Sequence, residues 1–188
     1  MTSLTSLRIS VLPLQAKPQG FAGMGADAEG YALPEPTTRF TFPQDHGPHR
    51  DFRIEWWYLT AVLTSASGEL FGAQWTLFRN GIRPTGQDSD QIWLGHAAVS
   101  TPQGHFHAER IARGGIGQAD VIATPFRAFI DEGEMTGPDP NNVVLTAQGT
   151  DFAYDLSLDA SLPFVLQGAN GYSQKSASGM ASYYFSQP

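Results

Sequence analysis

Glycine and proline are spread so evenly along this chain that long helices are excluded. The 188 residues include 20 glycines and 13 prolines. Inside a helix, a glycine costs about 1 kcal/mol and a proline about 3 kcal/mol relative to alanine. The one long stretch without either residue is His49–Ser67, and other such stretches, for example Thr150–Leu162, have 13 residues or fewer. Because 12% of the residues are aromatic as well, the class is predicted to be all-β rather than a helical bundle.

From Thr38 onward, short strand-like runs alternate with turn signals. About ten strands at regular spacing are typical of an antiparallel barrel or a strongly curved sandwich. The expected strands lie near residues 38–43, 52–64, 69–80, 90–100, 104–112, 125–131, 142–149, 151–159, 162–168 and 180–186.

The chain divides into a predicted flexible N-terminal segment, residues 1–37, and a β-domain, residues 38–188. Gln19–Pro36 is rich in Gly, Ala, Glu and Pro, which is a linker composition. Met1–Leu14 is interrupted by Arg8 and by Ser and Thr residues, so no signal peptide is visible. No run approaches the roughly 18 apolar residues of a membrane-spanning helix. We therefore expect no transmembrane segment.

Charge and cysteine content exclude several classes of function. Eleven Lys and Arg residues against 18 Asp and Glu residues give a net charge of −7, which argues against a nucleic-acid partner. The absence of cysteine excludes disulfides, zinc–thiolate sites and thiol catalysis. Gly171-Tyr172-Ser173-Gln174-Lys175 lacks the final glycine of a serine-hydrolase elbow, and Gly23-Met24-Gly25 is not a dinucleotide loop. A serine hydrolase or a nucleotide-dependent enzyme is thus not supported.

The first predicted hairpin has a register that apolar matching can fix. If the turn Ser65–Glu69 closes symmetrically, paired residue numbers sum to 134. Trp57 then pairs with Leu77, and Glu55 with Arg79. The other face of this hairpin is aromatic with a few hydrogen-bonding groups, which resembles the lining of a ligand cavity.

Glu55-Trp56-Trp57-Tyr58 is the most unusual run in the sequence. Consecutive strand residues point to opposite faces, so the two tryptophans cannot share a pocket without a bulge. One interpretation is a catalytic acid, in which Glu55 is a carboxyl group made a proton donor by desolvation beside aromatic walls. The alternative is an ion pair between Glu55 and Arg79 at the rim of the domain, with the tryptophans as core.

Histidines suggest weaker candidates. His105-Phe106-His107-Ala108-Glu109 places two imidazoles and a carboxylate on one strand face, as cupin metal sites do, but no His follows His107, so a solvated strand end is favoured. In Asp45-His46-Gly47-Pro48-His49, a turn in which Asp45 caps backbone groups is favoured over a metal site. His96 is interpreted either as a hydrogen-bonded core residue or as a cavity-facing proton shuttle. No metal is expected.

Three segments together resemble a known family. They are FPQDHGPHRDFRIEWWYLTAVL with ELFGAQWTLFR (42–79), WLGHAAVSTPQGHFHAERIARGG (93–115) and LQGANGYSQKSASGMASYYFSQP (166–188). The sequence is similar to the lipocalin-like superfamily of AttH and the carotenoid 1,2-hydratases, whose members are often labelled secreted hydrolases. The resemblance implies that residues 38–188 form the first of two lipocalin-like (calycin) β-domains, with the second, C-terminal β-domain as a partner. It also implies a periplasmic or secreted location.

The resemblance further implies a hydrophobic, isoprenoid- or lipid-like ligand and no cofactor. Hydratases of this type protonate an isolated C=C bond with a carboxylic acid and capture the cation with water, which makes Glu55 the candidate acid. The alternative is a non-catalytic, lipid-binding accessory domain of an export system. The family motif gives the candidate ligand-binding residues Trp56, Trp57, Tyr58, Gln74, Trp75, Arg79 and His96.

Overall fold

The computed structural model describes residues 29–176 and 180–188, and within them the chain is all-β. Apart from the short 3-10 turns Gln44–His46 and Asp88–Asp90, every element is a strand, and none of the described helices is long and apolar enough to cross a membrane. The strands are β1 (Ile54–Thr64), β2 (Leu70–Gly81), β3 (Gln91–Thr101), β4 (Gly104–Arg113), β5 (Ala119–Ile122), β6 (Phe126–Ile130), β7 (Gly133–Asp139), β8 (Asn142–Gln148), β9 (Ala153–Asp159), β10 (Val165–Leu166), β11 (Tyr172–Gln174), β12 (Ala181–Tyr183) and β13 (Phe185–Ser186).

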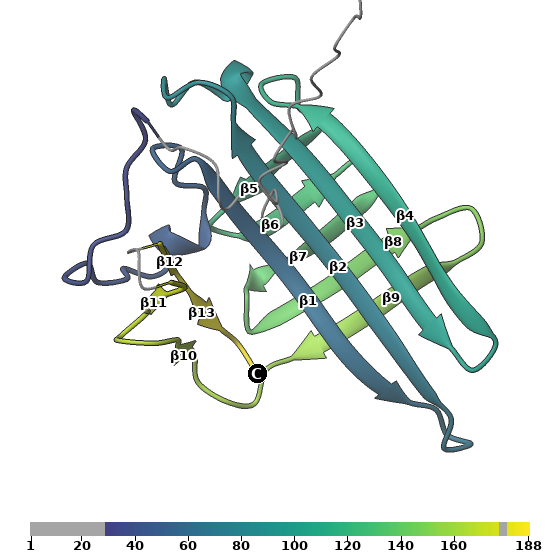
Figure 1. Cartoon of the computed structure of the whole chain (residues 1–188). Coiled ribbons are helices and arrows are strands. Elements are labelled where there is room, and N and C mark those ends of the chain that lie inside the picture. The colour runs from purple at the N-terminus through teal and green to yellow at the C-terminus, as the bar shows by residue number, and fades with distance from the viewer. Residues whose placement is uncertain (1–28, 177–179) are drawn as a thin grey trace, which may run out of the picture.

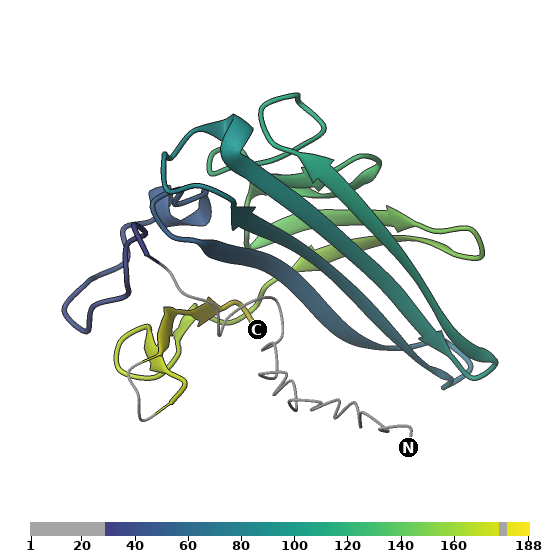
Figure 2. The same cartoon turned by 45° about the horizontal axis from the view of Figure 1, so that its top comes forward.

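The strands form a sandwich rather than a closed barrel. A four-stranded antiparallel sheet in the order β1-β2-β3-β4 packs on a five-stranded sheet in the order β5-β6-β7-β8-β9. The strands of the two sheets cross each other steeply, and the sheets form two separate layers (Figures 1 and 2). In the described part of the chain, no strand of one large sheet pairs with a strand of the other. Of the two predicted architectures, the sandwich is the one observed.

The number and position of the strands differ from the prediction of about ten. Residues 38–43 are not a strand, because Phe40 and Phe42 pack their rings on each other and on the C-terminal segment instead of pairing with a neighbouring strand. Gly133–Asp139 is a strand although it contains two glycines and a proline. Its pairing with β8 shifts between Thr136 and Asp139, and an irregularity of this kind accommodates proline within a sheet. The strands Ala119–Ile122 and Tyr172–Gln174 were not predicted either.

The predicted register of the first hairpin is confirmed. Trp57 pairs with Leu77 and Glu55 pairs with Arg79, and every other pair along β1 and β2 also sums to 134. Trp75 and Leu77 belong to the core cluster together with residues of the five-stranded sheet, and Trp57 packs against that cluster. Odd-numbered residues of β1 and β2 therefore face the five-stranded sheet, and even-numbered residues face away from it. We call these the inner face and the outer face of the four-stranded sheet.

The interior between the two sheets is filled by side chains. Its largest fully buried apolar members are Trp75, Leu77, Trp93, Ile130 and Leu145. The sheets approach so closely that a Cβ atom on Gly95 would lie 2.5 Å from Cγ2 of Ile130, which explains why this position is glycine. A pocket of about 20 Å³ remains beside Trp75 and Gly95, enough for about one water molecule.

The C-terminal segment is held against residues 35–46 at one end of the sandwich. The rings of Phe42 and Phe185 meet at 4.9 Å, and the hydroxyl of Tyr183 donates to Oγ1 of Thr38 at 2.6 Å. His46 is buried in this cluster, stacked on Phe42 at 4.6 Å, and its burial lowers the pKa of its imidazole below the usual 6.5. These contacts place the segment against the beginning of β1 (Figure 1). Most of the predicted flexible region 1–37 lies outside the described residues.

Candidate functional site

The predicted site residues divide between the two faces of the four-stranded sheet. The division follows from the alternation of side chains along β1, β2 and β3, which is regular through this region. A single ligand on one side of the sheet therefore cannot contact all of them. The inner face carries Glu55, Trp57, Trp75 and Arg79, and the outer face carries Trp56, Tyr58, Gln74 and His96.

Arg79 is the centre of a buried polar clamp on the inner face. Its side chain is 0% exposed, and its Nε donates to Oε2 of Glu55 at 2.7 Å. Its Nη1 donates to Oε1 of Gln91 at 2.5 Å. Its Nη2 donates to the backbone carbonyls of His49 and Phe52 at 2.9 and 2.6 Å. The guanidinium thereby ties the chain that enters β1 to the beginning of β3.

Glu55 accepts hydrogen bonds from three donors. Besides Arg79, the backbone N–H of His49 donates to Oε2 and Nδ1 of His49 donates to Oε1, both at 2.7 Å. The ion pair of Glu55 with Arg79, one of the two interpretations of this residue, is thus present. All three donors act on the carboxylate form, which is the form that cannot donate a proton.

His49 connects Glu55 to a second carboxylate, that of Asp45. Its Nε2 lies 3.0 Å from Oδ1 of Asp45, whose Oδ2 accepts the backbone N–H of Thr41 at 2.6 Å. The expected capping role of Asp45 is therefore confirmed. Hydrogen bonding to Glu55, more than any other cause, raises the pKa of His49 from 6.5 to about 9. At neutral pH the chain Asp45–His49–Glu55–Arg79 consequently alternates negative and positive charges.

Sequence reasoning did not find His49 and Gln91 as partners of this clamp. His49 was considered only as part of a turn or of a metal site with Asp45, and its separation of six residues from Glu55 is a weak signal. Gln91 reaches Arg79 through the pairing of β2 with β3, and nothing near Arg79 in the sequence indicates that contact.

The two inner-face tryptophans belong to the core. Trp75 is buried, and the rings of Trp57 and Trp93 lie 6.0 Å apart. The indole N–H of Trp57 donates to the backbone carbonyl of His46 at 2.9 Å, which fixes the turn before β1 on the sandwich.

The outer face carries two neighbouring rows of side chains that run across all four strands. The apolar row is Trp56, Phe78, Leu94 and Ile111, and the polar row is Tyr58, Thr76, His96 and Glu109. Ile111 at the end of the apolar row is 68% exposed, and Tyr58 at the beginning of the polar row is 40% exposed. Phe78 and Thr76, the two members on β2, are buried.

The C-terminal segment reaches the outer face at Tyr58. The hydroxyls of Tyr58 and Tyr184 form a hydrogen bond, and Lys175 lies 5.3 Å above the ring of Tyr184. Burial, reinforced by this hydrogen bond, raises the pKa of Tyr58 to about 12. The phenol of Tyr58 is therefore neutral over the physiological range.

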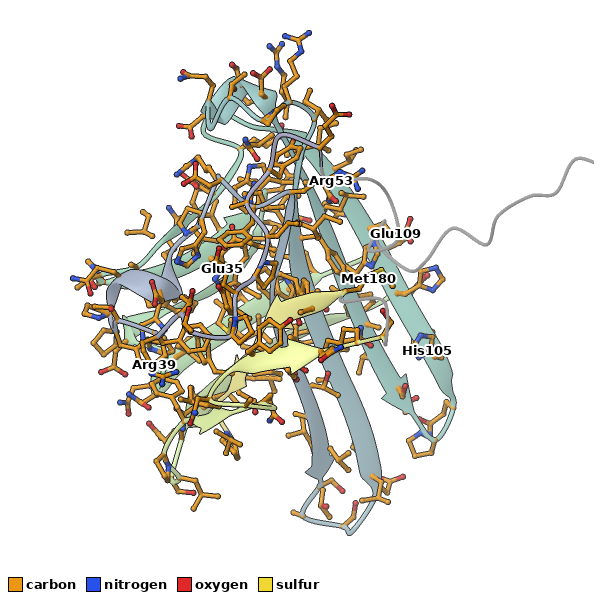
Figure 3. All side chains as sticks on the ribbon, turned by 60° about the vertical axis from the view of Figure 1, so that its left-hand side comes forward. Glu35, Arg39, Arg53, His105, Glu109 and Met180 are labelled. Atoms are coloured by element: carbon orange, nitrogen blue, oxygen red, sulfur yellow. The ribbon has the colours of Figure 1, made fainter. Side chains whose placement is uncertain are left out.

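His105 and His107 project from β4, the edge strand of this sheet, and Figure 3 labels His105 together with Glu109 on that strand. Their rings stack at 6.1 Å, and both side chains are exposed, as expected for a solvated strand end. Oγ of Ser100 lies 2.9 Å from Nδ1 of His105. Within residues 29–176 and 180–188, no three His, Cys, Asp or Glu side chains are arranged to hold a metal ion.

Comparison with known proteins agrees with the fold and with the motifs. The family model described as AttH-like matches residues 33–188. A crystal structure of a protein assigned to AttH from Nitrosomonas europaea has 35% sequence identity and a TM-score of 0.73. The match covers 84% of this chain and 49% of that chain, so this chain spans about half the length of that protein. No curated protein matches. The family match, the 35% identity and the shared β architecture together show that this chain belongs to the AttH-like family.

Proposed function

We propose that this protein binds a hydrophobic small molecule, isoprenoid- or lipid-like in character, on the outer face of the four-stranded sheet. The observation that carries the proposal is the apolar row, which leads from Trp56 to a strongly exposed Ile111. Exposed apolar side chains beside hydrogen-bonding groups are typical of ligand sites. In this row Ile111 is exposed, Trp56 and Leu94 are half-buried, and Phe78 is buried. Of the predicted ligand-binding residues, Trp56, Tyr58 and His96 stand in the two rows of this face.

The filled interior supports the choice of the outer face. Sites for small molecules measure roughly 300–1,000 Å³. The pocket of about 20 Å³ beside Trp75 is far too small for a lipid or an isoprenoid. A ligand inside the sandwich would have to displace Trp75, Trp93 or Leu145, which are fully buried. A ligand on the outer face displaces none of them.

A second β-domain is the proposed partner of this surface. The related protein from Nitrosomonas europaea is about twice as long as the matched region, which supports a further domain beyond the part that this chain resembles. A domain packed on the outer face would enclose the ligand between two β-layers and remove Ile111 from water. We place this protein in the periplasm or outside the cell, following the resemblance to secreted members, and cell fractionation tests that location.

Binding without catalysis by Glu55 is the candidate that the contacts favour. Glu55 lies on the inner face, and its carboxylate is engaged by Arg79 and His49. To protonate a C=C bond, Glu55 would have to leave both partners and reach the opposite side of the sheet. The hydration of an alkene by Glu55 stays a prediction, to be tested by the turnover of a Glu55→Gln variant.

The experiment is a ligand titration of the natural full-length protein followed by tryptophan fluorescence, with farnesol as the probe. Ile111→Ser removes an apolar side chain from the apolar row, and we expect it to weaken binding roughly tenfold. Ile116→Ser is the matched control, because Ile116 is 62% exposed but lies in the turn after β4. Equal affinity of the two variants, or no binding of farnesol by the unmodified protein, would overturn the proposal.

A further inference from the structure

The apolar row and the polar row are close enough to act on one molecule. Residues two apart along a strand stand on the same face, roughly 7 Å from each other. Trp56 and Tyr58 on β1, and Leu94 and His96 on β3, are such neighbours. A hydrocarbon chain lying along the apolar row therefore has its substituents within reach of the polar row.

His96 is the residue that joins the two rows. Its ring meets the ring of Phe78, a member of the apolar row, edge to face at 5.5 Å. Its two ring nitrogens can donate one hydrogen bond and accept another. Thr76 is its direct neighbour on β2, and Glu109 is its direct neighbour on β4.

The chemistry of the polar row is matched by a neutral hydroxyl group. Tyr58 and His96 each carry a group that donates and accepts hydrogen bonds, as an alcohol also does, whereas Thr76 between them is buried. The pKa of Tyr58, raised to about 12, keeps its phenol uncharged. Glu109, at the exposed end of the row, opposes a carboxylate ligand by charge repulsion.

We infer that the ligand is an amphiphilic alcohol, with a hydrocarbon chain on the apolar row and one hydroxyl group on the polar row, and that His96 is the residue that selects for the hydroxyl. This inference rests on the proposed function, because it concerns the same outer face. It states how the ligand is oriented across the sheet, and it gives His96 a role in specificity.

Farnesol and farnesene share a carbon skeleton and differ in the hydroxyl, so they are the probes, titrated against the natural full-length protein. One net hydrogen bond corresponds to a roughly fivefold preference for farnesol. His96→Phe keeps an aromatic ring against Phe78 but removes both nitrogens. We expect this variant to lose the preference for farnesol, so that the ratio of its affinities for farnesol and farnesene falls to about one.

His107→Phe is the matched control, because it makes the same substitution on the same face one row further along β4. We expect it to retain the preference for farnesol. Equal affinity of the unmodified protein for the two probes, or a preference unchanged in His96→Phe, would overturn the inference and leave the binding of hydrophobic molecules intact. Failure of both probes to bind would instead overturn the proposed function.

Discussion

The two faces of the four-stranded sheet depart from the usual separation of buried apolar and exposed charged side chains. Antiparallel sheets commonly bury an apolar face and expose a polar one. Here the inner face buries Arg79 together with Glu55, whereas the outer face exposes Ile111 and Val62. The buried charges are paired with each other and with backbone carbonyls, so they fix the position of the chain entering β1. Among the described residues, Ile111 and Val62 do not belong to the core cluster, which makes the outer face the place to look for a ligand.

The largest expected effect is on the inner face, at Arg79. Arg79→Met leaves the carboxylate of Glu55, the side-chain oxygen of Gln91 and two backbone carbonyls without this donor. Removing one partner of a buried ion pair costs about 3–5 kcal/mol. Urea denaturation measures the loss in the free energy of unfolding.

Arg127→Met is the control for that substitution. Arg127 also contacts a carboxylate, with its Nε 2.8 Å from Oε2 of Glu134, but the two side chains are 44% and 33% exposed. We expect a cost of about 1 kcal/mol or less. Similar losses in the two variants would show that burial does not distinguish Arg79, and the structural role given to the inner-face clamp would fail.

An intermediate effect is expected for Glu55→Gln. The amide keeps the shape of the side chain but removes the charge opposite Arg79 and His49, at a cost of about 2 kcal/mol in unfolding free energy. Because Glu55 lies on the inner face, farnesol should bind this variant with unchanged affinity. A tenfold weaker affinity would place the ligand at the clamp and contradict the assignment to the outer face.

The smallest effect is the pH dependence contributed by His49. Its pKa is raised from 6.5 to about 9 by Glu55, so its stabilising contribution is fully present below pH 6.5 and is lost as the pH rises through about 9. The side chain is 38% exposed, so solvent screening reduces the contribution to about 1 kcal/mol. Unfolding free energies at pH 6.5 and 9.5 measure it.

His49→Gln should remove most of the difference in stability between those two pH values. Tyr58, on the outer face, contributes little in this range, because its pKa is raised from 10 to about 12 and both values lie above pH 9.5. A pH dependence that survives in His49→Gln would mean that the alternating chain of charges is not the pH-sensitive element of the inner face.

Local patterns were enough to predict the fold class and the first hairpin. The turn Ser65–Glu69 and the apolar match of Trp57 with Leu77 fix the register, and that register brings Glu55 opposite Arg79. The strand Gly133–Asp139 was missed because its glycines and Pro138 are turn signals, and only pairing with both β6 and β8 overrides them. Local propensity cannot report such pairing.

The candidate site was predictable only in part, for the same reason. Alternation along β1 already separates Trp56 from Trp57, so the division of the site between two faces follows from the sequence. Which face of the four-stranded sheet is covered depends on the position of the five-stranded sheet. The burial of Trp75 between the two sheets could not be predicted from the sequence of β2 alone. The contact of Gln91 with Arg79 depends on the position of β3, which is also non-local.

The constant sum of paired residue numbers in the first hairpin limits how this family can vary in length. A residue inserted in β1 between Trp57 and Tyr58 would turn every preceding side chain of the strand to the opposite face. Glu55 would then lie on the outer face, and Trp56 would point into the core. A residue inserted between Ser65 and Glu69 changes only the loop, and the strands keep their partners. Insertions and deletions among relatives should therefore gather at this turn and avoid Glu55-Trp56-Trp57-Tyr58.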